Sequence, residues 1–119
     1  LAMCYIYCSG INPENELEYI RLVDRAIKEN ILEKDCTVKS AEQFLHNLTG
    51  RKTTVVKKSF FNIAAIKEPT PVRFKADGLA GHWVVVENGK IVFNSLLNSI
   101  NVTKGSPVEA RFIKWGIKE

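Results

Sequence analysis

GHWVVVENGKIVFNS, residues 81–95, has the pattern of two short strands joined by a tight turn. Three valines precede Asn88-Gly89, and an Ile-Val-Phe run follows it soon after. β-Branched and aromatic residues favour extended backbone, and Asn-Gly between such runs is the strongest short-range hairpin signal. The stretch therefore predicts a β-hairpin, with His82 near the start of its first strand.

The length of the turn decides which side chain faces His82. A two-residue loop, Asn88-Gly89, sets His82 opposite Ser95 and turns Asn94 to the other face of the hairpin. A three-residue loop over 87–89, with glycine in the left-handed position, is also common and sets His82 directly opposite Asn94. We expect this second register, in which the two Cβ atoms lie about 4.5–5.5 Å apart. The other face would then pack a core from Trp83, Val85, Ile91 and Phe93.

A histidine held by an asparagine is suited to nucleophilic catalysis, because the amide fixes the tautomer and the direction of the imidazole base. The hairpin lacks a nucleophile, and a thiol is the natural candidate, since a thiolate at a helix N-terminus beside an imidazolium is stabilised by both positive charges. The chain has three cysteines, Cys4, Cys8 and Cys36. Cys8 and Cys36 are interpreted as small buried apolar residues. The second histidine, His46, is interpreted as an exposed or half-buried helix residue.

Upstream of the hairpin, the hydrophobic pattern is helical. Residues 1–8 are apolar almost all round and are followed by Ser9-Gly10, which predicts the end of a buried helix. Apolar residues recur at helical spacing over residues 13–30, an amphipathic helix that Pro13 would open. Residues 40–43, Ser-Ala-Glu-Gln, form a capping box, and Gly50 is placed to end the short helix that follows.

After Gly50, short segments rich in β-branched or aromatic residues predict strands at 53–56, 72–74, 83–86, 91–93 and 108–113. Because helices come first and strands follow, the predicted class is α+β, with N-terminal helices packed on an antiparallel β-sheet. The 119 residues suit a single domain over residues 1–119. The sequence opens on Leu1, inside an apolar segment, so we expect the natural protein to extend upstream.

The hairpin resembles the histidine-bearing hairpin of papain-like cysteine peptidases, particularly the small bacterial double-glycine-peptidase-like branch. The matching positions are Gly81, His82, Trp83 and the valines, then a short turn and a strand that ends in Asn94-Ser95. A looser likeness to an uncharacterised bacterial family with this fold extends over most of the chain. The resemblance implies a papain-like fold and a hydrolase that cleaves a peptide or amide bond of a peptide or protein substrate, without a cofactor. His82 would shuttle the proton, and Asn94 would orient the imidazole of His82. Family members usually carry Asp at the position of Asn94, and Asn is the papain-type alternative.

The position of the nucleophile stays open. LAMCYIYCSG, residues 1–10, resembles the helix that follows the nucleophilic cysteine in that branch. The nucleophile should open this helix, so we expect a cysteine immediately upstream of Leu1. Cys4 is the alternative nucleophile, although it leaves barely two helical turns before Gly10. Without any nucleophile, the chain would be a catalytically inactive papain-like module that binds a peptide or a protein partner.

The composition of the chain bears on nucleic-acid binding, membrane association, disulfides and metal binding. The net charge of +4 is mild, and the densest basic stretch, Arg51, Lys52, Lys57 and Lys58, is interpreted as a solvated strand edge rather than a nucleic-acid patch. No apolar run approaches the length of a transmembrane helix, so no membrane partner is expected. Three cysteines without paired-ligand spacing predict neither a disulfide framework nor a metal site. The lack of a disulfide pattern favours a cytoplasmic location.

Overall fold

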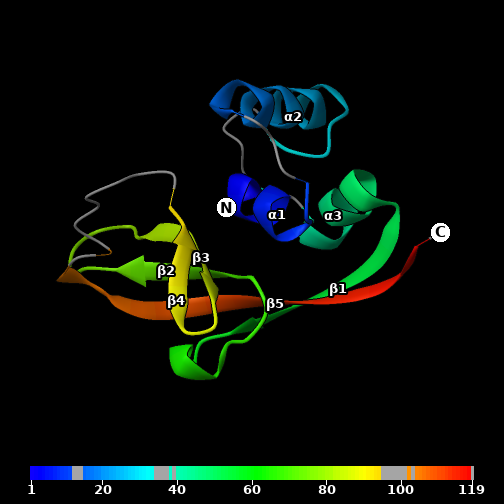
Figure 1. The fold of residues 1–119 in the computed structure, drawn as a ribbon. Coiled ribbons are helices and arrows are strands. Elements are labelled where there is room, and N and C mark those ends of the chain that lie inside the picture. Colours follow the sequence, from blue (N-terminus) through cyan, green and yellow to red (C-terminus); the bar gives the residue numbers. More distant parts are fainter. Residues whose placement is uncertain (12–14, 34–37, 39, 95–101, 103, 119) are drawn as a thin grey trace. The chain divides into compact units, whose positions relative to one another are not determined.

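The computed structural model describes the chain except for residues 12–14, 34–37, 39, 95–101, 103 and 119. The described residues form three α-helices, one short 3-10 turn and a five-stranded antiparallel sheet (Figure 1). The order of strands in the sheet is β1-β5-β2-β3-β4. The predicted α+β class, with helices before strands, is confirmed.

The chain divides into two compact units. The first comprises Leu1–Val55 with Ile113–Glu119, and the second comprises Val56–Phe112. Strands β1 (Arg51–Lys58) and β5 (Ser106–Lys118) each contribute residues to both units. The helices belong to the first unit, and the hairpin with its histidine belongs to the second.

Local signals in the sequence set the ends of the helices. Helix α1 spans Ala2–Cys8, α2 spans Glu16–Lys28 and α3 spans Ala41–Thr49. At α3 the predicted cap is present, because the Ser40 hydroxyl accepts a hydrogen bond from the Gln43 amide at 3.2 Å and Gly50 ends the helix with a φ of 70°. At α2 the expected start was wrong: the side chain of Asn15 caps the helix by accepting from the Glu18 amide at 3.1 Å, and Pro13 lies outside the described residues.

The first unit has its own core, in which the helices pack on the adjoining ends of β1 and β5. Tyr5 and Phe44 are fully buried and meet edge to face with their ring centroids 6.4 Å apart. Val55 of β1 and Ile113 and Trp115 of β5 pack against this cluster. Gly116 allows β5 to approach β1, because a Cβ atom there would clash with the carbonyl oxygen of Lys52.

The second unit is a sheet with a cluster of buried hydrophobic residues on one face. Strand β2 (Thr70–Lys75) pairs with β3 (His82–Glu87), and Val72 lies opposite Val84 while Phe74 lies opposite His82. Strand β4 (Lys90–Phe93) then forms the edge of the sheet. The core of this unit is made of Ile66, Val72, Phe74, Val84, Val86 and Ala110.

The predicted core face of the hairpin was wrong except at Val85, which is fully buried as expected. Val84 and Val86 belong to the core, and they share the face of His82 because side chains alternate along a strand. Of the residues expected to pack the core, Ile91 is 41 % exposed and Trp83 is half-buried. The reason is the pairing with β2, whose apolar Val72 and Phe74 lie on the face of Val84 and Val86.

Candidate functional site

The turn of the hairpin has two residues, so the expected three-residue loop was wrong. Asn88 and Gly89 have φ values of 52° and 75°, the positive pair that a type I′ turn requires, and Glu87 pairs with Lys90. The ladder then shifts by one residue, because Val86 pairs with Ile91 while Val85 pairs with Phe93. Val92 is the extra residue of a β-bulge in β4.

This bulge decides where Asn94 points. In an unbroken two-residue register, Asn94 would lie across from Trp83 on the face away from His82. The extra residue moves the pairing on by one, and one residue of shift transfers every following side chain to the other face. Asn94 therefore follows Phe93 on the face of Val84, one diagonal step from His82 and within reach of a long side chain.

The predicted contact between His82 and Asn94 is present, although by a different route from the one expected. The distance between Nε2 of His82 and Oδ1 of Asn94 is 2.7 Å. An amide oxygen only accepts, so Nε2–H donates and the neutral ring carries its lone pair on Nδ1. The asparagine thus fixes both the tautomer and the direction of the imidazole, and Nδ1 becomes the basic atom.

The residue before His82 has to be a glycine. Gly81 has a φ of +101°, in the region that side chains rarely adopt, and a Cβ atom there would lie 3.1 Å from both Cγ of Arg73 and the carbonyl oxygen of Phe74. Strand β3 begins immediately afterwards, so this tight approach sets the direction in which the chain enters the strand.

Neither described cysteine has the surroundings of a reactive thiol. Cys4 lies within α1 and is only 2 % exposed, and Cys8 is also buried. Burial raises the pKa of the Cys4 thiol to about 11, whereas catalytic cysteines have a lowered pKa. Cys36 lies outside the described residues. His46 is exposed in the last turn of α3, as its position in the sequence predicted.

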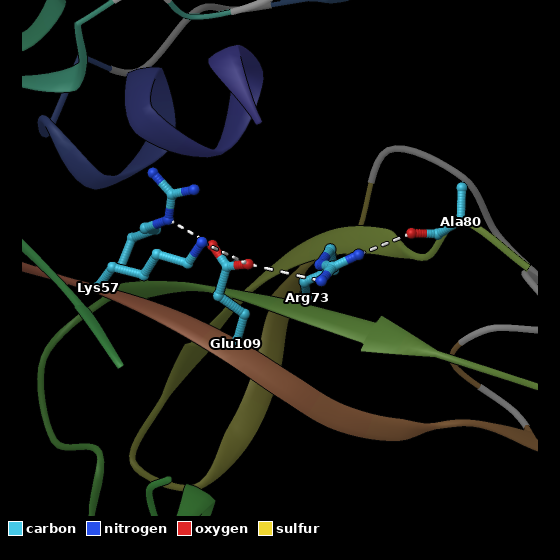
Figure 2. A network of polar contacts seen from close by, with 5 residues as sticks. Lys57, Arg73, Ala80 and Glu109 are labelled. Carbon is cyan, nitrogen blue, oxygen red and sulfur yellow. Dashed lines mark hydrogen bonds and ion pairs between the residues drawn. The ribbon is translucent and has the colours of Figure 1, made fainter. Parts of the chain in front are cut away.

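A charged cluster on the opposite face of the sheet was missed by the sequence analysis. Glu109 of β5 is almost completely buried, and three cations surround its carboxylate (Figure 2). Its Oε2 accepts from Nε of Arg111 at 2.6 Å, and its Oε1 lies 3.5 Å from Nη2 of Arg73 and 3.7 Å from Nζ of Lys57. Alternating Glu109 and Arg111 in β5 signal one charged face, but their partners come from β1 and β2.

The basic stretch at the start of β1 has structural partners. Nε of Arg51 donates to the carbonyl of Gly116 at 2.9 Å, and its guanidinium lies over the ring of Trp115. Lys58 lies over the ring of Phe112. Since β1 is also an edge of the sheet, the interpretation of this stretch as a strand edge is confirmed.

Comparisons with known proteins give no relative. No family model, no curated protein and no solved structure matches the chain.

None of the helices that the structure describes has the length and apolar character needed to cross a bilayer. Within the described ranges, no three His, Cys, Asp or Glu side chains gather as a metal ion would require.

Proposed function

We propose that this chain carries the base and the orienting residue of a cysteine hydrolase that cleaves a peptide or amide bond. The observation that supports the proposal is the 2.7 Å hydrogen bond from Nε2 of His82 to Oδ1 of Asn94. It leaves Nδ1 as the atom that takes a proton from a thiol and later gives it to the leaving amine. The likeness of the hairpin to that of papain-like cysteine peptidases agrees with this assignment of roles.

The chemistry proceeds in two steps. A cysteine thiolate adds to the carbonyl carbon of the scissile bond, the C–N bond breaks, and the amine leaves with the proton held by His82, which forms a thioester. His82 then takes a proton from water, the hydroxide adds to the thioester, and the thiol is released with the acid product. The thiolate must come within hydrogen-bond reach of Nδ1. Cys4 does not suit this role, since it is buried with a raised pKa, and the resemblance to papain-like peptidases implies a cysteine upstream of Leu1 instead.

The test is the labelling of the natural, full-length protein with iodoacetamide across a pH series, with the modified cysteine mapped by mass spectrometry. Fast labelling of one cysteine near neutral pH is expected, and His82→Ala should abolish it. Asn94→Ala should slow it by about tenfold, the equivalent of one hydrogen bond, and Asn94→Asp should restore it because it keeps the accepting oxygen. Slow labelling of all cysteines, at rates that His82→Ala does not change, would reject the proposed hydrolase function.

One observation favours a second candidate, an inactive module of the same fold that binds a peptide or a protein partner. Both described cysteines, Cys4 and Cys8, are buried and have no exposed thiol to offer. This candidate predicts that His82→Ala leaves peptide binding unchanged within a factor of about two, far less than the tenfold effect of one hydrogen bond. It is excluded if the natural protein turns over an amide substrate and His82→Ala abolishes that turnover.

A further inference from the structure

The residues before His82 are held by a side chain from the neighbouring strand. His82 is the first residue of β3, so the ladder with β2 begins only there, at the pair of Phe74 and His82. Nη1 of Arg73 donates to the carbonyl oxygen of Ala80 at 2.8 Å, just ahead of the ladder. The Cγ and Cδ atoms of Arg73 also lie against Gly81, within about 3.2 Å of where a Cβ would stand.

Arg73 is anchored at its other end. Its Nη2 lies 3.5 Å from Oε1 of the buried Glu109, so the two terminal nitrogens of one guanidinium join β5 to the segment that leads into His82 (Figure 2). The planar guanidinium fixes the angle between these two contacts, whereas a lysine ammonium at the same place is a single point. Lys57 and Arg111 hold the Glu109 carboxylate from its other sides.

The placement of Arg73 on the sheet makes its action indirect. Arg73 pairs with Trp83, and Phe74 pairs with His82, so the Arg73 side chain lies on the face opposite His82. It therefore acts on the backbone of residues 80–81 and not on the imidazole. Its Nε is buried and has no acceptor among the described residues, so the two outer nitrogens provide the polar contacts that hold the side chain.

We propose that Arg73 is a positioning residue for His82: by bridging Glu109 and the Ala80 carbonyl, it fixes the backbone at Gly81 and with it the imidazole against Asn94. Its relevance to catalysis rests on the proposed hydrolase function. The geometry itself can be tested separately, because the hydrogen bond between His82 and Asn94 has a spectroscopic signature of its own.

The experiment measures solvent exchange of the His82 Nε2 proton in the ¹⁵N-labelled protein. Arg73→Met and Arg73→Lys should each speed this exchange by about tenfold, since the imidazole loses its fixed aim at Asn94. Arg73→Lys keeps the positive charge and loses the bridge, so it separates geometry from charge. Lys57→Met is the matched control, because it removes one cation from Glu109 and leaves the contact with Ala80 intact; it should leave the exchange rate unchanged.

Each outcome is decisive. Exchange in Arg73→Lys and Arg73→Met at the rate of Lys57→Met would overturn the positioning role. Equal acceleration in all three variants would also overturn it, because the effect would then belong to the charge around Glu109. The proposed hydrolase function is rejected by a different result, namely iodoacetamide labelling of a cysteine at a rate that His82→Ala does not change. That result leaves the exchange measurement valid.

Discussion

At the scale of single residues, the two chemically interesting side chains of this chain differ in their surroundings. His82 is half-buried, and its ring is directed by an amide at one nitrogen. Cys4 is buried, and burial favours its neutral thiol. A working thiolate–imidazolium pair needs the opposite environment for its sulfur, which is why the proposed nucleophile is another cysteine.

The pKa of Cys4 predicts how stability changes with pH. Burial raises this pKa from 9.0 to about 11, so the unfolded chain loses the proton first as the pH rises. The stabilising contribution is complete below pH 9.0 and is lost as the pH rises toward about 11, and the two units of difference correspond to about 3 kcal/mol. Urea denaturation near pH 8 and about pH 11 should show a smaller loss of stability in Cys4→Ala than in the parent. Equal losses in the two proteins would contradict the assignment.

At the scale of elements, sequence signals identified what is local and missed what depends on pairing. The caps at Ser40 and Gly50 are made by neighbouring residues, and both were predicted correctly. The turn was placed at Asn88-Gly89, but its predicted length of three residues was wrong. The bulge at Val92 carries no glycine or proline to mark it. It lies where the register between β3 and β4 shifts by one residue, between the pairs Val86–Ile91 and Val85–Phe93.

The ion pairs of Glu109 were missed for the same reason, because they depend on strand pairing. Its three cations come from β1, β2 and β5, whose registers are set by contacts far apart in the chain. The division of the chain into two compact units has no signal in the sequence, because β1 and β5 contribute to both and no linker separates them. The pair His82 and Asn94 could be named because a hairpin keeps its partners close in sequence.

The bulge in β4 predicts how the hydrogen bond between His82 and Asn94 responds when one residue is deleted from the strand or added to it. Val92 is the extra residue, so its deletion leaves Val86 opposite Ile91 and Val85 opposite Phe93 in an unbroken ladder. Asn94 then keeps its face, and the hydrogen-bonded Nε2 proton of His82 should remain visible by NMR. Insertion of a second valine after Val92 is the opposing control, because a further shift of one residue turns Asn94 away. Loss of the proton signal on deletion would show that the bulge has another role.

At the scale of the whole molecule, stability rests on two separate cores. Phe44 anchors the helical unit against Tyr5, and Val72 and Val84 anchor the sheet of the second unit. The large aromatic side chains are not all used in this way, because Phe60 is 95 % exposed. The contribution of a phenylalanine to the free energy of unfolding therefore depends on whether its ring is buried in one of these cores.

Replacing Phe44 by alanine should destabilise the protein by about 3–5 kcal/mol, because it removes a fully buried ring and leaves a cavity. This is a large part of the about 5–15 kcal/mol that holds a typical domain. Phe60→Ala deletes the same atoms from an exposed site and should change stability by less than about 0.5 kcal/mol. Urea denaturation of the two variants gives the comparison, and similar losses in both would contradict the assigned core.

The bulge in β4 also bears on how copies of this chain behave in concentrated solution. Strand β4 is an edge of the sheet, and its Ile91 and Val92 are exposed. A flat apolar edge of this kind is a template on which another chain can add a strand and begin to aggregate. A short strand that opens with Lys90 and is bent at Val92 offers few consecutive backbone groups in line. The irregularity that brings Asn94 to the histidine thus also shortens the regular run of backbone groups that this edge presents to another chain.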